Sequence, residues 1–220
     1  DAREEVLAAV ELLGGVAAEA LQAMGAAAWS SSGACLRAAA PRGVAAVLAP
    51  WTFPLALPAV LAGAALAAGN AVVLKPSEDT PLVAARLVDG LLEAGLPPAV
   101  LGLVQGTGEE AGAPLVRHPE AGLVAFAGFP DVAREVAIAC AAERKRAIAL
   151  AMGREAVLVL DDGDAELAVA RIAAGTFALS GRRRPALHIV LQGKAGRQVQ
   201  ERLLEVAQAA RPGDGLLPET

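Results

Sequence analysis

The segment from Gly43 to Glu78 constrains the fold of this chain more than any other, because it reads as strand, turn, helix, strand and turn. Its sequence is GVAAVLAPWTFPLALPAVLAGAALAAGNAVVLKPSE. The apolar runs at 44–48 and 71–74 predict buried strands, and the longer apolar stretch at 57–68 predicts a helix between them. Two strands joined in this way lie parallel in a sheet that helices cover on both faces.

The same alternation extends along the chain. An amphipathic helix is predicted at 1–25, and the polar break WSSSGA at 29–34 is the predicted linker. Further helices are predicted at 81–94, 109–117, 130–142, 164–179 and 196–209, with strands at 100–105, 123–127, 147–151, 156–160 and 186–191. The predicted fold is α/β: a Rossmann-like parallel sheet at 41–153, after a lead-in helix and linker at 1–40, and then the start of a second α/β domain at 154–220.

Composition narrows the function classes. The chain has 220 residues with 55% hydrophobic content, so it can form a sizeable core. A net charge of −5 argues against nucleic acid as a partner. The apolar stretch at 55–68 contains Pro58 and Gly63 and is too short for a membrane span, and no leader with a cleavage site opens the chain. We therefore expect a cytoplasmic protein with no membrane partner.

Metal binding is not predicted either. Cys35 and Cys140 lie in different segments without metal-ligand spacing, and Cys140 fits a small buried thiol. His118 and His188 are too few and too scattered for ligation. Three aspartates at 161, 162 and 164 precede a predicted helix, where capping of its N-terminus explains them better than a metal does.

The turn KPSE at 75–78 carries the first sign of ligand binding. Lys75 can donate to a small polar ligand, and Glu78, three residues later, can accept hydrogen bonds from a ribose diol. The alternative is an ordinary strand-to-helix turn, in which Glu78 or Asp79 helps to begin the next helix. The turn alone does not decide between these interpretations.

Together with APWTFP at 49–54, KPSE makes the chain resemble the aldehyde dehydrogenase superfamily. The resemblance covers essentially the whole chain, and the final RPGDGLLPET is similar to a family loop of the type KVGDPLDPET. It implies an NAD site at the carboxyl ends of the strands. The residues that it places there are Trp51, Thr52, Lys75, Ser77, Glu78, Gly106 and Gly128.

Several positions depart from the family pattern. Thr52 stands where the family has an asparagine that stabilises an oxyanion. Gly106 matches a turn on the adenine side, although strand-to-helix turns use glycine for geometric reasons too. After Gly128, Phe129 replaces the serine of the family's FTGS turn, and Asp131 adds negative charge near a helix start that would attract phosphate. The resemblance therefore implies NAD or NADP bound weakly, or not at all.

The positions that correspond to the family's catalytic residues differ more from the family pattern. Ala151 falls where the family has the glutamate that activates water, and Arg184 falls on the nucleophilic cysteine, with Arg182 on a glutamine. An alanine methyl cannot accept a proton, and a guanidinium cannot form a thiohemiacetal. The arginine run is interpreted as a solvated turn, with binding of a phosphate or carboxylate as the alternative.

These observations predict a pseudoenzyme with no catalytic residues, similar to the non-catalytic modules of tandem aldehyde dehydrogenases or proline-utilisation flavoproteins. Its expected role is structural, interdomain or in oligomerisation, and its expected partner is the remainder of a longer parent chain or a second copy. One alternative is an NAD(P)-dependent oxidoreductase acting on an aldehyde or semialdehyde. Another is a nucleotide sensor that uses Lys75 and Glu78 without catalysis.

Overall fold

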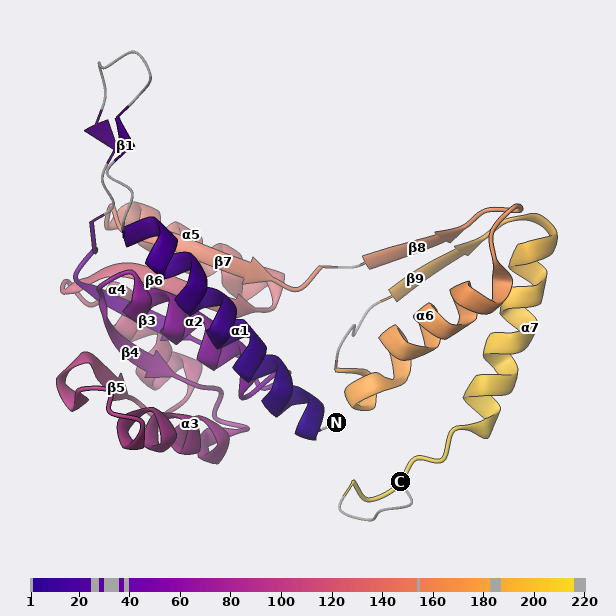
Figure 1. Cartoon of the computed structure of the whole chain (residues 1–220), viewed down its shortest axis with the longest axis horizontal. Coiled ribbons are helices and arrows are strands. Elements are labelled where there is room, and N and C mark those ends of the chain that lie inside the picture. The colour runs from indigo at the N-terminus through magenta and orange to yellow at the C-terminus, as the bar shows by residue number, and fades with distance from the viewer. Residues whose placement is uncertain are drawn as a thin grey trace. The chain divides into compact units, whose positions relative to one another are not determined.

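A computed structural model describes residues 2–24, 28–29, 36–37, 40–153, 155–182 and 187–215 of the chain (Figure 1). The chain divides into two compact units, Asp1–Met152 and Gly153–Thr220. Each unit has its own sheet and its own apolar core.

The first unit is built on five parallel strands. These are β3 (Val44–Leu48), β4 (Ala71–Lys75), β5 (Leu101–Leu103), β6 (Ala121–Gly128) and β7 (Arg146–Ala151). Their order in the sheet is β5-β4-β3-β6-β7. Because consecutive strands first move to one side of β3 and then to the other, the sheet is doubly wound, which confirms the predicted Rossmann-like α/β fold.

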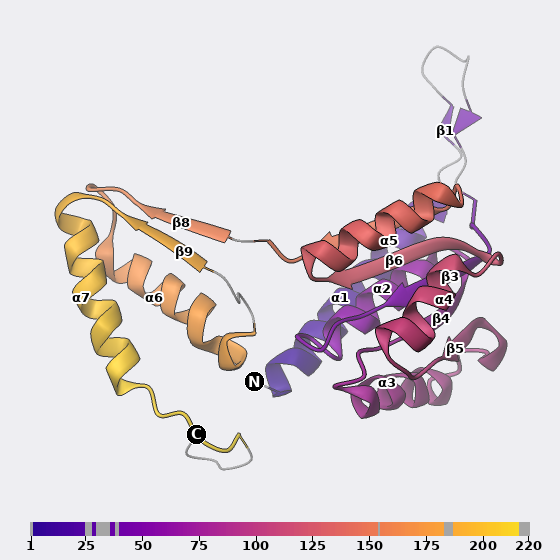
Figure 2. The same cartoon turned by 180° about the vertical axis from the view of Figure 1, so that it is seen from behind.

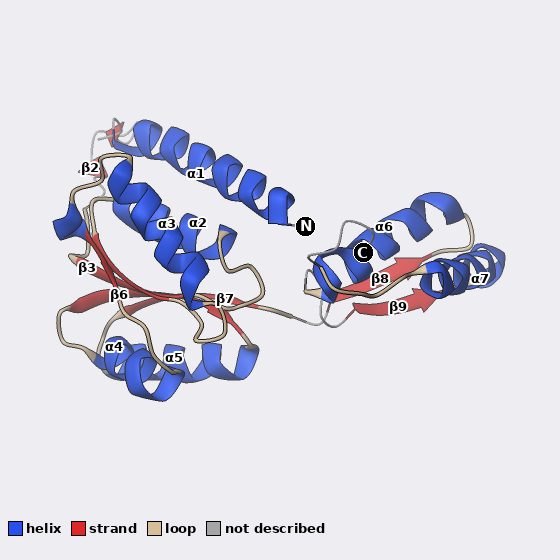
Figure 3. Ribbon diagram, turned by 90° about the horizontal axis from the view of Figure 1, so that it is seen from below, coloured by secondary structure: helices blue, strands red, loops and turns tan. Residues whose placement is uncertain are grey.

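Helices cover both faces of this sheet, as Figure 3 shows. On one face, α2 (Ala56–Ala67) and α3 (Pro81–Glu93) pack against the strands, and α1 (Ala2–Met24) packs on α2. On the other face lie α4 (Ala113–Arg117) and α5 (Pro130–Ala142). Buried Leu74 belongs to the core under α2 and α3, and buried Val124 to the core under α4 and α5. The strands are apolar on both sides for this reason.

Two predicted segments differ from the structure. The predicted linker begins at Trp29, but β1 (Ala28–Trp29) pairs antiparallel with β2 (Leu36–Arg37), so part of this region is extended and paired; residues 30–35 lie outside the described residues. The predicted helix at 109–117 is a wide π-helical turn, η2 (Gly108–Gly112), followed by α4. Pro114 has no N–H to donate to the preceding turn, which accounts for the break.

The second unit is smaller (Figure 2). Its two parallel strands are β8 (Glu155–Val159) and β9 (Leu187–Leu191), and its helices are α6 (Ala165–Phe177) and α7 (Gly193–Ala209). A short 3₁₀ turn, η3 (Ala178–Gly181), follows α6. The buried core is formed by Val159, Val169, Ile172 and Val199.

The aspartates before α6 have two different roles. Asp164 accepts a hydrogen bond from the Leu167 backbone N–H at 3.0 Å, so its predicted capping of this helix is confirmed. The prediction is wrong for Asp161, whose Oδ1 accepts from the backbone N–H groups of Lys194 and Ala195 at the start of α7. The parallel pairing of β8 and β9 brings Asp161 to that helix start, which local sequence could not indicate.

Helix α1 shows a property that the sequence interpretation did not consider. Within the described residues, the segment Ala2–Ala23 is long and apolar enough to cross a membrane, by length and composition alone. In this structure α1 packs along α2, with Ala9 buried and Leu13 against Gly63.

Candidate functional site

The candidate site lies at the carboxyl ends of the strands in the first unit. Leu48 at the end of β3 is in register with Lys75 of β4 on one side and with Phe126 of β6 on the other. The chain leaves β3 toward α2 on one face and leaves β6 toward α5 on the opposite face. Open α/β sheets bind ligands in the crevice at such a reversal of strand order.

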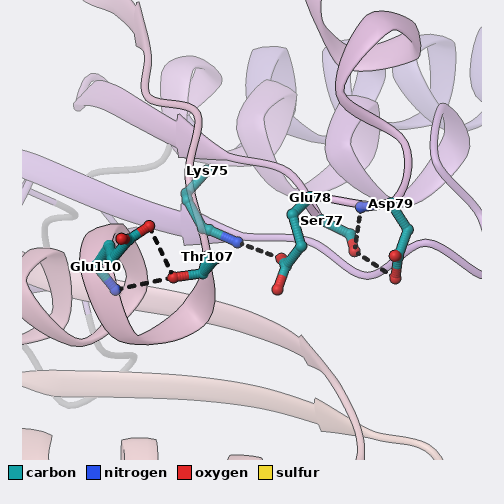
Figure 4. A network of polar contacts seen from close by, with 6 residues as sticks. All are labelled: Lys75, Ser77, Glu78, Asp79, Thr107 and Glu110. Carbon is teal, nitrogen blue, oxygen red and sulfur yellow. Dashed lines mark hydrogen bonds and ion pairs between the residues drawn. The ribbon is translucent and has the colours of Figure 1, made fainter.

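Lys75 and Glu78 form an ion pair at the end of β4, with 2.9 Å between Lys75 Nζ and Glu78 Oε2 (Figure 4). The Lys75 side chain is buried, with 6% exposed, whereas that of Glu78 is 48% exposed. The Lys75 stem passes close to Gly112, where an added Cβ would lie 3.9 Å from Lys75 Cδ. The structure therefore brings the two predicted ribose-side residues together and leaves the carboxylate open to solvent.

The surroundings of Glu78 favour its charged form. A hydrogen bond from its own backbone N–H lowers the pKa of the Glu78 carboxyl, and the Lys75 ammonium and the Gly108 backbone N–H lower this pKa further. Partial burial acts in the opposite direction without cancelling the shift. An anionic carboxylate can accept from both hydroxyls of a vicinal diol, and it repels a phosphate.

Ser77 lies in the same turn and is buried. Its Oγ accepts from the Asp79 backbone N–H at 3.3 Å and lies 3.4 Å from Asp79 Oδ2 (Figure 4). These contacts hold the turn that follows β4, which is the structural role that such serine turns usually have. A contact of Ser77 with a cofactor stays a prediction.

The turn after β5 is fixed by Thr107. Thr107 Oγ1 accepts from the Glu110 backbone N–H at 3.1 Å and donates to Glu110 Oε2 at 3.2 Å. Gly106 has φ +141°, and a Cβ there would lie 3.0 Å from Ala111 Cβ. The turn by itself thus requires glycine at 106, so its predicted contact with a cofactor stays a prediction.

The turn after β3 presents one residue and encloses the next. Trp51 is 38% exposed, while Thr52 is 2% exposed. Thr52 Oγ1 lies 3.9 Å from the Met152 sulfur, just beyond the end of β7. Thr52, which the resemblance places at the family's oxyanion position, is therefore buried beside Met152 in this structure.

The turn after β6 departs most from a phosphate site. Phe129 is 49% exposed at the position before α5, and the first residue of α5 is Pro130, which has no N–H. Asp131 places a carboxylate in the first turn and forms an ion pair with Arg134, 3.6 Å between Oδ1 and Nη1. These residues do not form the set of free N–H groups that phosphate prefers at a helix start.

Ala151 is the residue that the resemblance places at the family's general base. It is the last residue of β7, is exposed, and is in register with Gly128 at the end of β6. A Cβ on Gly128 would lie 2.6 Å from Phe126 Cζ. Packing against Phe126 is therefore enough to require glycine at position 128. Arg184 lies outside the described residues, so its correspondence to the nucleophile position stays a prediction. Arg182 is described and follows η3.

The remaining titratable groups do not form a metal site in the part of the chain that the structure describes. Cys140 is 1% exposed in the core under α5, as predicted. Burial raises the pKa of its thiol, and the nearby Lys145 charge lowers it by less. Cys140 is therefore a packing residue.

Several residues of the site were missed from sequence. The N-cap Thr107, which accepts from the Glu110 N–H and donates to the Glu110 carboxylate, lies in the pattern T-x-x-E and could have been recognised. Glu5 accepts hydrogen bonds at the start of α2 from the N–H groups of Leu55 at 2.8 Å and Ala56 at 3.4 Å. This contact, like that of Met152 with Thr52, joins segments far apart in the chain and leaves no local signal.

The comparisons with known proteins agree with this architecture. Residues 1–220 match the aldehyde dehydrogenase family. The chain belongs to this family. Phenylacetaldehyde dehydrogenase of Pseudomonas fluorescens is 46% identical over 138 residues, which cover 62% of this chain and 27% of that protein.

Two solved structures extend the match along the chain. HpcC from Thermus thermophilus has a TM-score of 0.84 and 34% identity, covering 96% of this chain and 42% of that chain. PnpE from Pseudomonas sp. WBC-3 has a TM-score of 0.77 and 36% identity over 82% of this chain and 37% of that chain. PnpE has also been solved in complex with nicotinamide adenine dinucleotide. The chain thus spans less than half the length of these relatives.

Proposed function

We propose that this chain is a non-catalytic aldehyde dehydrogenase-like module with a structural, interdomain or oligomerisation role, and that it binds NAD weakly or not at all. The observation that carries the proposal is Ala151, which ends β7 at the carboxyl edge of the sheet. Its methyl group cannot activate water. Arg184 at the nucleophile position supports the same conclusion, because a guanidinium is not a nucleophile.

The cofactor fits only part of the crevice. The exposed carboxylate of Glu78, held by buried Lys75, suits a ribose diol. The start of α5 does not suit a pyrophosphate, because Phe129, Pro130 and Asp131 provide an aromatic ring, a missing N–H and a negative charge. The site therefore suits the ribose of NAD or NADP better than its pyrophosphate.

A second candidate is an NAD(P)-dependent oxidoreductase acting on an aldehyde or semialdehyde. The intact Lys75–Glu78 pair favours it, as do relatives named for phenylacetaldehyde and malonate semialdehyde. This candidate needs a base and a nucleophile from outside the positions where the family keeps them.

Exposed apolar surface supports the structural role, with the remainder of a longer parent chain or a second copy as the proposed partner, in the cytoplasm. Strand β7 is an edge strand, and its Ile148 and Leu150 are 46% and 48% exposed. Sheet edges and apolar faces of this kind favour association. A monodisperse monomer with no affinity for the rest of its parent protein would contradict this role.

Aldehyde-dependent NADH formation tests the proposal. We expect no turnover of small aldehydes or semialdehydes with NAD or NADP. Calorimetry should give a dissociation constant for NAD in the high micromolar range or weaker, which corresponds to a binding free energy of about −5.5 kcal/mol or one closer to zero. The double variant Ala151→Glu with Arg184→Cys restores both reactive groups and is the matched comparison. Turnover by the unmodified protein that persists after contaminating dehydrogenases are removed would contradict the proposal.

A further inference from the structure

Helix α1 carries an apolar stripe that is exposed along its length. This α1 stripe consists of Leu7, Val10, Gly14, Ala17 and Leu21, which are alternately three and four positions apart and therefore share one face of the helix. Leu7 and Val10 are each 63% exposed, and Leu21 is 77% exposed. The spacing is that of the seam between two paired helices.

The opposite side of α1 holds the helix on the first unit. Ala9 is buried there, and Gly63 of α2 lies so close that an added Cβ would be 2.5 Å from Leu13 Cδ2. The buried Glu5 carboxylate accepts from the Leu55 N–H at 2.8 Å. Figure 3 shows α1 outside α2, farther from the sheet. These contacts fix α1 and leave the α1 stripe open to solvent.

Two glycines in the middle of α1 have no contact that explains them. An added Cβ at Gly14 or Gly15 would meet nothing within 4 Å, and neither residue has a left-handed backbone. Glycine inside a helix is less stable than alanine, because it loses more conformational freedom on folding. At Gly63 the glycine is required because two helices approach closely. Gly14, which lies in the α1 stripe, indicates a similar close approach by a helix outside this chain.

The charges of α1 determine which partner suits the stripe. Residues 2–24 include four glutamates and one arginine: Glu4, Glu5, Glu11, Glu19 and Arg3. A helix that binds the surface of an anionic membrane carries Lys and Arg on its polar face, and carboxylates inside a membrane-spanning helix are costly. Although α1 is long and apolar enough to cross a membrane, these charges do not favour a bilayer as its partner.

A second copy of α1 fits the α1 stripe when the two helices run antiparallel. Residues 12–18, LLGGVAA, carry no charge, and most of the glutamates precede them. A parallel pair would bring the N-terminal glutamates of both copies to the same end, whereas an antiparallel pair separates them and aligns the helix dipoles favourably. With Gly14 at the crossing, Leu7 of one copy lies opposite Leu21 of the other, as twofold symmetry requires.

The size of this contact predicts weak association. A helix of 23 residues is about 35 Å long and about 10 Å across. Two such helices bury on the order of 1,000 Å² in total over their rounded surfaces, which is near the lower limit for a specific interface. We therefore expect a dissociation constant of about 10–100 μM.

We propose that the α1 stripe is a self-association surface, through which two copies of this chain pair by antiparallel packing of their α1 helices about Gly14. The proposal rests on the proposed oligomerisation role, since it names the partner and the surface for that role. Neither the Lys75–Glu78 pair nor strand β7 takes part in it.

Sedimentation velocity of the 220-residue chain, from about 1 to about 300 μM, tests the pairing. We expect an equilibrium between monomer and dimer. Leu21→Glu should weaken it at least about tenfold, because it places a charge in an apolar contact on each copy. Gln22→Glu is the matched control, because it adds the same charge at the next position, which is exposed and off the α1 stripe. It should change the dissociation constant by less than about twofold.

A second pair of variants tests the close approach at Gly14. Gly14→Gln should weaken association at least about tenfold, because the distance between packed helices depends on the side chains at their contact. Gly15→Gln adds the same side chain beside the α1 stripe and should leave association unchanged within about twofold. Both substitutions raise helix propensity equally, so different results cannot come from folding. Thermal unfolding followed by circular dichroism checks that both variants are folded.

Two double variants test the orientation. Leu7→Lys combined with Leu21→Glu sets opposite charges against each other in an antiparallel pair and like charges in a parallel one. It should associate at least about fivefold more tightly than Leu21→Glu alone. Leu7→Glu combined with Leu21→Glu sets like charges against each other in both orientations and should be the weakest of these variants.

A protein that stays monomeric at the highest concentration would overturn the inference, as would a dimer that Leu21→Glu and Gly14→Gln leave intact. Binding of the α1 stripe to vesicles of phosphatidylcholine and phosphatidylglycerol, or to the rest of the parent protein, in place of self-association would overturn it too. A dimer lost only in Ile148→Lys would support the oligomerisation role through β7 and overturn this surface. Aldehyde-dependent NADH formation would instead contradict the proposed function and leave the measured pairing of α1 as it stands.

Discussion

The first unit covers both faces of its sheet with helices, whereas among the described residues of the second unit helices pack on one face of the sheet. In the first unit, Val72 and Leu74 on one side and Val124 on the other are each at most 1% exposed. In the second, Val159 of β8 is buried against α6 and α7, while Leu158 beside it is 62% exposed and Val190 of β9 is 53% exposed.

The two units therefore differ in how much apolar surface they bury and how much they leave exposed to solvent. A sheet covered on both faces buries apolar side chains on both sides of its central strands. The second unit has one buried face and, next to its core, a groove of about 430 Å³ between α6, β9 and α7, lined by Ile172, Ile189 and Leu203. The candidate ligand site belongs to the first unit. Exposed apolar side chains lie on its edge strand β7 and on the outer face of the β8–β9 pair in the second unit.

We expect the largest effect on stability when the same substitution, leucine to alanine, is made at one strand position in each unit. Leu74→Ala removes a fully buried side chain of β4 and should lower the free energy of unfolding of the first unit by about 2–5 kcal/mol. Leu158→Ala, on the exposed face of β8, should change that of the second unit by less than about 0.5 kcal/mol. Hydrogen exchange of peptides from β4 and β8 in urea measures both. A larger cost at Leu158 would show that its face is covered in solution.

An intermediate effect compares the long-range helix caps of the two units. Glu5→Ala removes the buried cap of α2 and should lower the free energy of unfolding by about 2 kcal/mol. Asp161→Ala removes the exposed cap of α7 and should lower it by about 1 kcal/mol. Urea unfolding followed by circular dichroism measures both changes.

Neighbouring carboxylates provide the controls for these caps. Glu4→Ala and Asp162→Ala remove an exposed carboxylate from the same segments. They should change stability by less than about 0.5 kcal/mol. Equal losses for a cap and its neighbour would mean that total charge, and not the cap, stabilises the helix.

The smallest effect is local to the crevice of the first unit. Because the folded state lowers the pKa of Glu78, the stability that this carboxylate contributes is fully present above its unfolded pKa of about 4.3 and is lost as pH falls through the folded value. Glu78→Gln should therefore be less stable than the wild type at pH 7, by less than about 1 kcal/mol because the carboxylate is half exposed. Below the folded pKa the two proteins should converge. Urea unfolding at a series of pH values measures this, and a constant difference down to the most acidic pH would contradict it.

Much of the fold could be predicted, because the apolar periodicity of strands and helices is a property of residues close together in the sequence. The strand at 44–48 has the predicted bounds, and α5 has the predicted bounds of 130–142. The break between η2 and α4 was missed, since a helical apolar pattern does not show how a proline will redirect the hydrogen bonds before it.

For the candidate site, the sequence predicted that Lys75 and Glu78 lie together, because they are three positions apart in one turn. It also placed Ala151 at a strand end by its apolar run. The motifs and their departures from the family pattern were therefore determined by the sequence alone.

Only the tertiary structure decided which side chains meet across the chain. Packing of α1 on α2 takes Glu5 to Leu55, the parallel β8–β9 pair takes Asp161 to the start of α7, and the ends of β3 and β7 bring Thr52 to Met152. The physical reason is that a hydrogen bond forms only between a donor and an acceptor that lie close together in space. Distance in space is fixed by how helices and strands pack, and no local pattern of residues records it.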